Sequence, residues 1–256
     1  MTTQKRTAFF SIMGIIIFLM GGYLTLDWYQ FFSGTYNIQQ AEVPWVRATK
    51  VAVSFLSAII VFIIGKDGFD RKDTRRLFLV YLVIFIGDIF LVLDIELVGT
   101  GVFALSHVFY IIRNGAGFSN YMRDGNRSHR FWDAASAVII LTVITLTMTL
   151  LYYPMDGGSV MFYAILGYSL FLGVSVWTAW TSLRIGYFPT ANAILAGIGM
   201  SLFLASDLTV GIHFLTEPGK LQVFSIYLCW IFYTPALVLP ALSGYDLDKV
   251  FSGKNL

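Results

Sequence analysis

The stretch LFLVYLVIFIGDIFLVL, residues 77–93, decides how this chain folds. It is apolar throughout except for the Gly87-Asp88 pair, and basic residues precede it at Arg75 and Arg76. A helix needs about 20 predominantly apolar residues to cross the roughly 30 Å hydrocarbon core of a bilayer. The stretch lacks the alternating polarity of an outer-membrane strand. It therefore predicts a membrane-spanning helix, in which the backbone satisfies its own hydrogen bonds.

The same pattern recurs along the 256-residue chain, which is 57% hydrophobic and only 12% charged. A soluble domain of this size has no core large enough to absorb so much apolar surface. The sequence therefore predicts an all-α polytopic membrane protein, built as a single integral membrane domain over residues 1–256. Its eight expected transmembrane helices cover about 8–31, 50–65, 76–95, 97–114, 132–153, 159–183, 189–213 and 220–243.

The basic residues fall mainly on one side of these spans. Of the seventeen lysines and arginines, fourteen lie in segments that eight spans place on the same side as the two termini. Because basic residues mark the cytoplasmic side of a membrane protein, both termini are expected in the cytoplasm. The first apolar run is longer than the core of a signal peptide, and no small-residue cleavage site follows it. We expect this run to remain as the first helix.

Two aspartates, Asp88 and Asp207, lie well inside the expected spans, whereas the other thirteen acidic residues lie in loops or near span ends. An aspartate at the middle of a span costs about 3 kcal/mol on insertion scales, so such residues usually face the bundle interior and are often functional. One interpretation is therefore a functional site. The alternative is that each aspartate is neutral and hydrogen-bonds two helices together.

Short connections place further polar residues level with these aspartates. With the turn between the third and fourth spans centred near residue 97, Asp88 and His107 are nine and ten residues from it. Asp207 and Tyr227 are each ten residues from the turn between the seventh and eighth spans. At 1.5 Å per residue, all four lie about 10–15 Å from the non-cytoplasmic helix ends. The sequence predicts one polar layer, in which Asp88 and His107 can meet.

Carboxylate chemistry is what this polar layer indicates. A catalytic zinc usually needs three protein ligands, whereas His107 is the one histidine deep in a span and Cys229 is the only cysteine. No serine nucleophile elbow or phosphate-binding glycine loop is present. Two carboxylates in a low dielectric are expected to share a proton, which gives one acid and one base. Glycosidases use such a pair to cleave acetals through an oxocarbenium-like centre.

The chain resembles the YhhN family of membrane proteins, which includes the lysoplasmalogenases. The resemblance extends over about residues 50–243, with the motifs in the expected order. The residues that carry it are Gly87, Asp88, Gly101, Phe103, His107, Tyr110, Leu202, Phe203, Ser206, Asp207, Trp230 and Tyr233.

The resemblance implies an ether hydrolase that cleaves the vinyl ether of a lysoplasmalogen to a fatty aldehyde and glycerophospho-ethanolamine or -choline. Asp88 and Asp207 would divide the acid and base roles, and His107 would orient or tune Asp88. Lys50 is a candidate contact for the phosphate, or else a lysine that extends to the membrane interface. The resemblance also implies that Tyr110, Tyr227 and Tyr233 hydrogen-bond water or the glycerol, and Ser206 is a further expected supporting residue.

Two other functions fit the same residues. A titrating carboxylate pair also suits a proton-coupled transporter of a small molecule or lipid, and a structural or sensory bundle would use the aspartates only for stability. The expected partners are a lysophospholipid substrate and the bilayer, with no metal, cofactor or nucleic acid. The expected location is a bacterial inner membrane or a eukaryotic endomembrane such as the endoplasmic reticulum.

Overall fold

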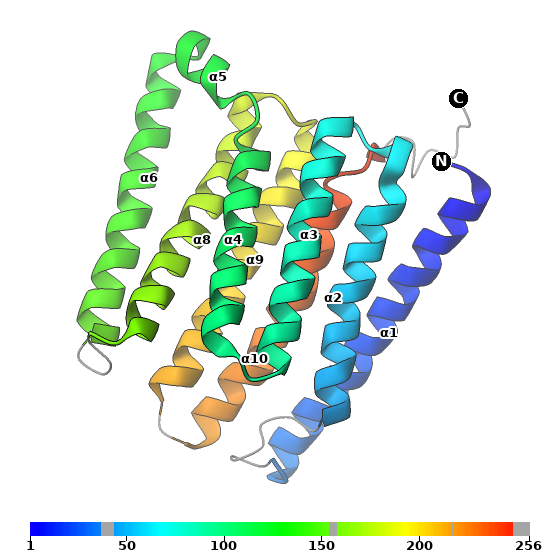
Figure 1. The fold of residues 1–256 in the computed structure, drawn as a ribbon, viewed down its shortest axis with the longest axis vertical. Coiled ribbons are helices and arrows are strands. Elements are labelled where there is room, and N and C mark those ends of the chain that lie inside the picture. Colours follow the sequence, from blue (N-terminus) through cyan, green and yellow to red (C-terminus); the bar gives the residue numbers. More distant parts are fainter. Residues whose placement is uncertain (37–43, 154–157, 217, 248–256) are drawn as a thin grey trace.

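The long apolar runs of the sequence form helices in the computed structural model, which describes residues 1–36, 44–153, 158–216 and 218–247 (Figure 1). A short 3₁₀ helix (Gly65–Asp67) follows α2, and a π-helical turn (Met148–Tyr152) follows α6. The described residues contain no strand, which confirms the predicted all-α class. The α-helices are α1 (Thr3–Ser33), α2 (Pro44–Ile64), α3 (Arg71–Val92), α4 (Glu96–Asn114), α5 (Phe118–Asp124), α6 (Arg127–Thr147), α8 (Val160–Ile185), α9 (Thr190–Leu215) and α10 (Lys220–Leu242).

Capping residues begin some of these helices earlier than the apolar pattern indicates. The α3 helix begins at Arg71, because the Asp70 carboxylate accepts hydrogen bonds from two backbone N–H groups of its first turn. Asn126 caps α6 and Ser159 caps α8 in the same manner. Such caps satisfy N–H groups that have no partner within the helix. The short helix α5 lies between the fourth and fifth expected spans, 97–114 and 132–153.

Seven helices in the described part of the chain are long and apolar enough to cross a membrane, namely α1, α2, α4, α6, α8, α9 and α10. The 22-residue α3 lies between α2 and α4 (Figure 1). The α3 helix is not one of the seven, because it carries more charged residues along its length than they do, among them Arg75, Arg76 and Asp88. The protein is therefore a multi-pass integral membrane protein, and the number of eight spans stays a prediction.

Both ends of the described chain lie on one side of the bundle. The amino group of Met1 is 3.2 Å from a carboxylate oxygen of Asp67. The backbone N–H of Asp246 donates to the carbonyl of Asp67 at 2.9 Å. We call this end of the bundle, marked by Met1, Asp67 and Asp246, the termini side. That it faces the cytoplasm stays a prediction.

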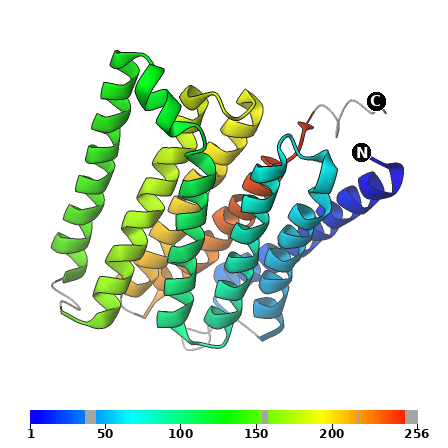
Figure 2. The same ribbon diagram turned by 45° about the horizontal axis from the view of Figure 1, so that its top comes forward.

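Six helices pack in a closed ring. The α2 helix packs on α3, α3 on α4, α4 on α8, α8 on α9, α9 on α10, and α10 returns to α2. The α1 helix packs on α2 and α10, and α6 packs on α8. In both views α1 and α6 lie at opposite edges of the bundle (Figure 1 and Figure 2). The polar residues expected inside the membrane lie on the helices of this ring.

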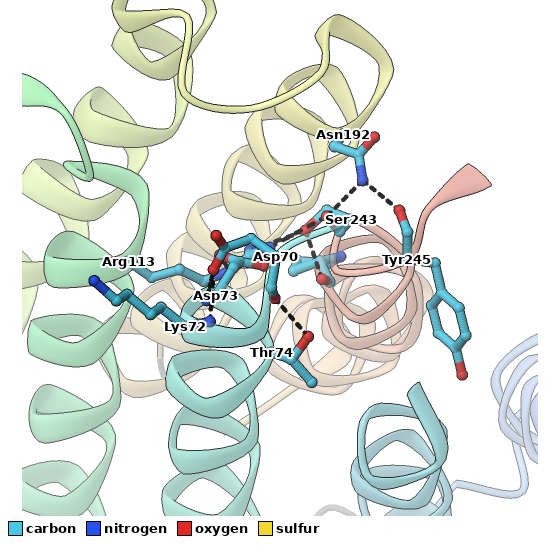
Figure 3. Close-up of polar contacts among 9 residues, drawn as sticks. Asp70, Lys72, Asp73, Thr74, Arg113, Asn192, Ser243 and Tyr245 are labelled. Atoms are coloured by element: carbon cyan, nitrogen blue, oxygen red, sulfur yellow. Dashed lines mark hydrogen bonds and ion pairs between the residues drawn. The ribbon is translucent and has the colours of Figure 1, made fainter. Parts of the chain in front are cut away.

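A buried ion pair ties the ring together on the termini side (Figure 3). Arg113 at the end of α4 donates from Nε and Nη2 to the two carboxylate oxygens of Asp73 in α3, at 2.7 and 2.9 Å. Its Nη1 also donates to the Ser243 hydroxyl beyond α10, at 2.9 Å. Asn192 of α9 donates to the Ser243 carbonyl at 2.8 Å. These bonds fix the ends of four helices relative to one another.

The packing of α3 on α4 sets the depth of the site residues. Gly87 lies against the Phe103 ring, so tightly that a Cβ atom at Gly87 would be 2.8 Å from it. This contact centres the antiparallel hairpin near residue 95, two residues before the expected centre. His107 therefore lies closer to the termini side than Asp88 by about five residues, or about 7.5 Å at the rise of an α-helix.

Candidate functional site

Asp88 of α3 is held by a tyrosine of α10. The Tyr233 hydroxyl donates to both carboxylate oxygens, with distances of 2.8 Å to Oδ1 and 3.0 Å to Oδ2. Both residues are buried, with 7% of each exposed. A carboxylate removed from water is costly unless it is hydrogen-bonded. The Tyr233 bond therefore helps to explain how the apolar run of α3 tolerates an aspartate.

Asp207 of α9 has an equivalent partner on α8. The Tyr168 hydroxyl donates to Oδ2 of Asp207. The same hydroxyl lies 3.4 Å from Nε2 of His107 on α4. Asp207 and Tyr168 are half-buried, whereas His107 is fully buried. Both aspartates thus accept a hydrogen bond from a tyrosine of another helix.

His107 contacts the partner of Asp207. Its Nδ1 lies 3.0 Å from the Ser175 hydroxyl of α8, and its ring centroid lies 5.4 Å from that of Tyr168. The expectation from the sequence paired His107 with Asp88. Because the α3–α4 hairpin is shifted by two residues, His107 lies nearer the termini side than Asp88 and not level with it. At this position His107 is next to Tyr168, the tyrosine that binds Asp207.

An aromatic side chain connects the two aspartate–tyrosine pairs. Phe203 of α9 lies edge-on to His107 and to Tyr233, with ring centroids 5.8 and 5.7 Å apart. The buried Tyr110 of α4 contacts both Phe203 and His107, at 6.2 Å in each case. Edge-to-face packing stabilises such rings in a defined geometry. The two aspartate–tyrosine pairs therefore belong to one contiguous cluster.

Lys50 of α2 is buried inside the bundle. Its Nζ lies 3.2 Å from Oδ2 of Asp27 on α1, and the two side chains are 0% and 4% exposed. The ammonium also lies 4.5 Å from the ring centre of Trp230 and 5.6 Å from that of Tyr23. A carboxylate and aromatic faces stabilise a desolvated ammonium. Trp230 in turn packs edge-on against the tyrosine that holds Asp88.

The two remaining candidates from the sequence contact residues outside this cluster. The Ser206 hydroxyl lies 3.1 Å from the Cys229 sulfur, which joins α9 to α10. The Tyr227 hydroxyl donates to the side-chain carbonyl of Gln30 on α1 at 3.4 Å. Ser206 and Tyr227 are both buried, so either would contact a substrate only after a change in its surroundings.

Sequence reasoning missed Tyr168, Ser175 and Asp27. Tyr168 and Ser175 lie in the apolar run 159–183, where hydropathy does not distinguish one polar side chain from another. Asp27 carried a clearer signal, since it lies within the expected first span, 8–31, and is buried. Its position near the end of that span led to its being grouped with the acidic residues in loops or near span ends.

Comparison with known proteins identifies the family. No curated protein and no solved structure matches the chain significantly. Residues 45–243 match the YhhN family. This matched segment runs from the start of α2 to the end of α10, so it includes the ring and both deep aspartates. The α1 helix, which supplies Asp27, lies before the matched segment. Because the match covers most of the chain, this protein belongs to the YhhN family.

Proposed function

We propose that this protein hydrolyses the vinyl ether bond of a lysoplasmalogen within the membrane and releases a fatty aldehyde and glycerophospho-ethanolamine or -choline. The observation that carries the proposal is the pair of intramembrane aspartates, Asp88 and Asp207, each hydrogen-bonded to a tyrosine in one contiguous cluster. Family membership supports it, since the YhhN family is linked to lysoplasmalogenase activity.

Cleavage of a vinyl ether needs one acid and one base. The acid protonates the β-carbon of the double bond, whose π electrons form the new C–H bond and leave an oxocarbenium ion. Water adds to this cation while the base takes a proton from the water, which gives a hemiacetal. The hemiacetal breaks its C–O bond, and its hydroxyl proton passes to the departing glycerol oxygen. One water molecule is consumed, and acid–base catalysis of such steps contributes about 10²–10⁴-fold in rate.

Asp88 and Asp207 are the residues that would exchange these protons. Their tyrosine partners would hold each carboxyl group in one orientation, as proton transfer to a bound substrate requires. Lys50 is the proposed contact for the substrate phosphate, which would share or replace the ion pair of its ammonium with Asp27. Other supporting contacts, to water or to the glycerol, are proposed for Tyr110, Tyr227, Tyr233 and Ser206.

The test is aldehyde release from a synthetic lysoplasmalogen by the purified protein in detergent. The saturated alkyl ether of the same chain length is the matched control, because it has no double bond to protonate and should remain intact. Asp88→Asn and Asp207→Asn should each lower aldehyde release by about a hundredfold or more. Undiminished release in either variant contradicts the acid–base pair.

A proton-coupled transporter is the outcome that would replace this proposal. Reconstituted liposomes would then show substrate-dependent proton movement, and no aldehyde would form. Whether the membrane is a bacterial inner membrane or a eukaryotic endomembrane is a separate prediction, which localisation of the tagged protein in its own cells would test.

A further inference from the structure

The hydroxyl of Tyr168 lies between two groups that can take its proton. It donates to Oδ2 of Asp207 and lies 3.4 Å from Nε2 of His107. A tyrosine hydroxyl has one proton and can also accept one hydrogen bond. Tyr168 can therefore receive a proton from one of these neighbours while it gives its own proton to the other.

Ser175 sets the direction in which this proton can move. Its hydroxyl donates to the Leu172 carbonyl at 2.7 Å, which uses the only proton it has. The Ser175 oxygen is then left to accept a hydrogen bond from Nδ1 of His107, 3.0 Å away, and we assign His107 the tautomer with its proton on Nδ1. A neutral imidazole carries one N–H, so Nε2 presents a lone pair to Tyr168. In this tautomer His107 accepts a proton and has none to supply toward Tyr168.

We propose that Asp207, Tyr168 and His107 form a proton relay, in which Asp207 is the base that takes a proton from water and Asp88 is the acid. This inference rests on the proposed vinyl ether hydrolysis and adds the roles of the two aspartates. Because the last group of this relay, His107, accepts a proton, the relay suits the step that removes a proton from water. Asp207 is also the more exposed of the two aspartates.

The relay conserves protons and charge. When water attacks the oxocarbenium ion, a lone pair of the water oxygen forms the C–O bond and one water proton passes to Asp207. Once Asp207 is protonated, the Tyr168 hydroxyl turns its proton from Asp207 toward Nε2 of His107. Asp207 then gives the water proton to the Tyr168 oxygen as the Tyr168 proton passes to Nε2. Asp207 is again a carboxylate, Tyr168 is again neutral, and His107 has become an imidazolium. After product release the stored proton returns through Tyr168 to the half-buried Asp207 and passes from there to water, and Asp88 regains the proton that it gave to carbon.

Deuterium exchange separates the two halves of the reaction. In D₂O the acid delivers deuterium to the β-carbon, and the adjoining bond of the oxocarbenium ion is single and can rotate. If water capture is slow, the cation returns to vinyl ether and can lose hydrogen instead of deuterium. Recovered lysoplasmalogen then carries deuterium at its β-carbon, which mass spectrometry detects. Protonation and water capture are thus measured independently in each variant.

Three variants remove the base or its relay. Tyr168→Phe removes only the hydroxyl. His107→Gln keeps a donor for Ser175 and an acceptor for Tyr168 but cannot take a proton. For these two and for Asp207→Asn, we expect aldehyde release to fall by about a hundredfold or more with little change in KM, while recovered substrate gains deuterium. Asp88→Asn should lose both release and exchange. Tyr163→Phe, an exposed tyrosine on the same helix, is the matched control and should behave as wild type.

Each other result overturns some part of the inference. Loss of both release and exchange in Tyr168→Phe or His107→Gln would indicate a structural role only, and full release in either would remove that residue from the relay. Exchange that persists in Asp88→Asn would contradict its role as the acid. A folded wild-type protein that neither releases aldehyde nor exchanges deuterium overturns the proposed hydrolase itself, and the relay with it.

Discussion

Replacing Arg113 with methionine tests how much the buried ion pair on the termini side contributes to stability. The change removes both donors to Asp73, whose carboxylate side chain is 0% exposed and would remain buried without its cation. Removing one partner of a buried ion pair costs about 3–5 kcal/mol, because the other charge is left uncompensated. We expect the free energy of unfolding to fall by about that amount.

The measurement is a titration of the purified protein from mild detergent micelles into SDS, followed by circular dichroism and tryptophan fluorescence. Arg123→Met is the matched control, since Arg123 and Asp124 form an exposed ion pair with side chains 74% and 64% exposed. Exposed pairs contribute less than about 1 kcal/mol.

A double variant separates the charge effect from loss of packing. Asp73→Leu combined with Arg113→Met leaves no buried charge at this position, so it should be more stable than Arg113→Met alone. Two results would refute the reasoning: a loss under about 1 kcal/mol in the single variant, or a double variant no more stable than the single one.

Three further predictions concern packing, capping and a second ion pair. Gly87→Ala places a Cβ atom 2.8 Å from an aromatic ring of α4 and should destabilise the protein by about 1–3 kcal/mol in the same titration, whereas Gly101→Ala enters open space and should not. Asp70→Ala removes the α3 cap at a cost of about 1 kcal/mol. Backbone N–H groups of that cap lower the pKa of the Asp70 carboxyl below its ordinary value of 3.8. The cap therefore contributes its full stability above pH 3.8 and loses it as the pH falls through the lowered pKa. In acid, the free energies of unfolding of Asp70→Ala and wild type should become equal. Asp27→Leu, which leaves Lys50 buried without its carboxylate, should lower the free energy of unfolding by about 3–5 kcal/mol, and adding Lys50→Leu should recover part of that loss.

The helices and the two deep aspartates could be predicted because they depend on composition along the chain. The run 77–93 is apolar enough to predict a helix whatever its neighbours are, and α3 does contain it up to Val92. Asp88 and Asp207 are conspicuous for the same reason, since a carboxylate in such a run is costly. Neither inference needs knowledge of which helices pack together.

The hydrogen-bond partners could not be predicted, because they depend on how each helix is rotated and shifted. Tyr163 and Tyr168 both lie on α8, yet only Tyr168 points at an aspartate, while Tyr163 is exposed. When lipid surrounds a helix, its outer and inner faces are both apolar, so hydropathy does not identify the inner one. A shift of two residues in one hairpin was likewise enough to move His107 away from the level of Asp88.

The ring of six helices closes between α2, its first member in the chain, and α10, its last. Proteins are made from the amino terminus, so Asp88 of α3 is synthesised long before Tyr233 of α10. During that interval the carboxylate lacks the donor that it has in the finished bundle. The nascent protein must therefore shelter Asp88 in another way, with water or with the insertion machinery, until its final helix arrives. A chain released from the ribosome before residue 220 would lack Tyr233, the tyrosine that binds Asp88 in the complete protein.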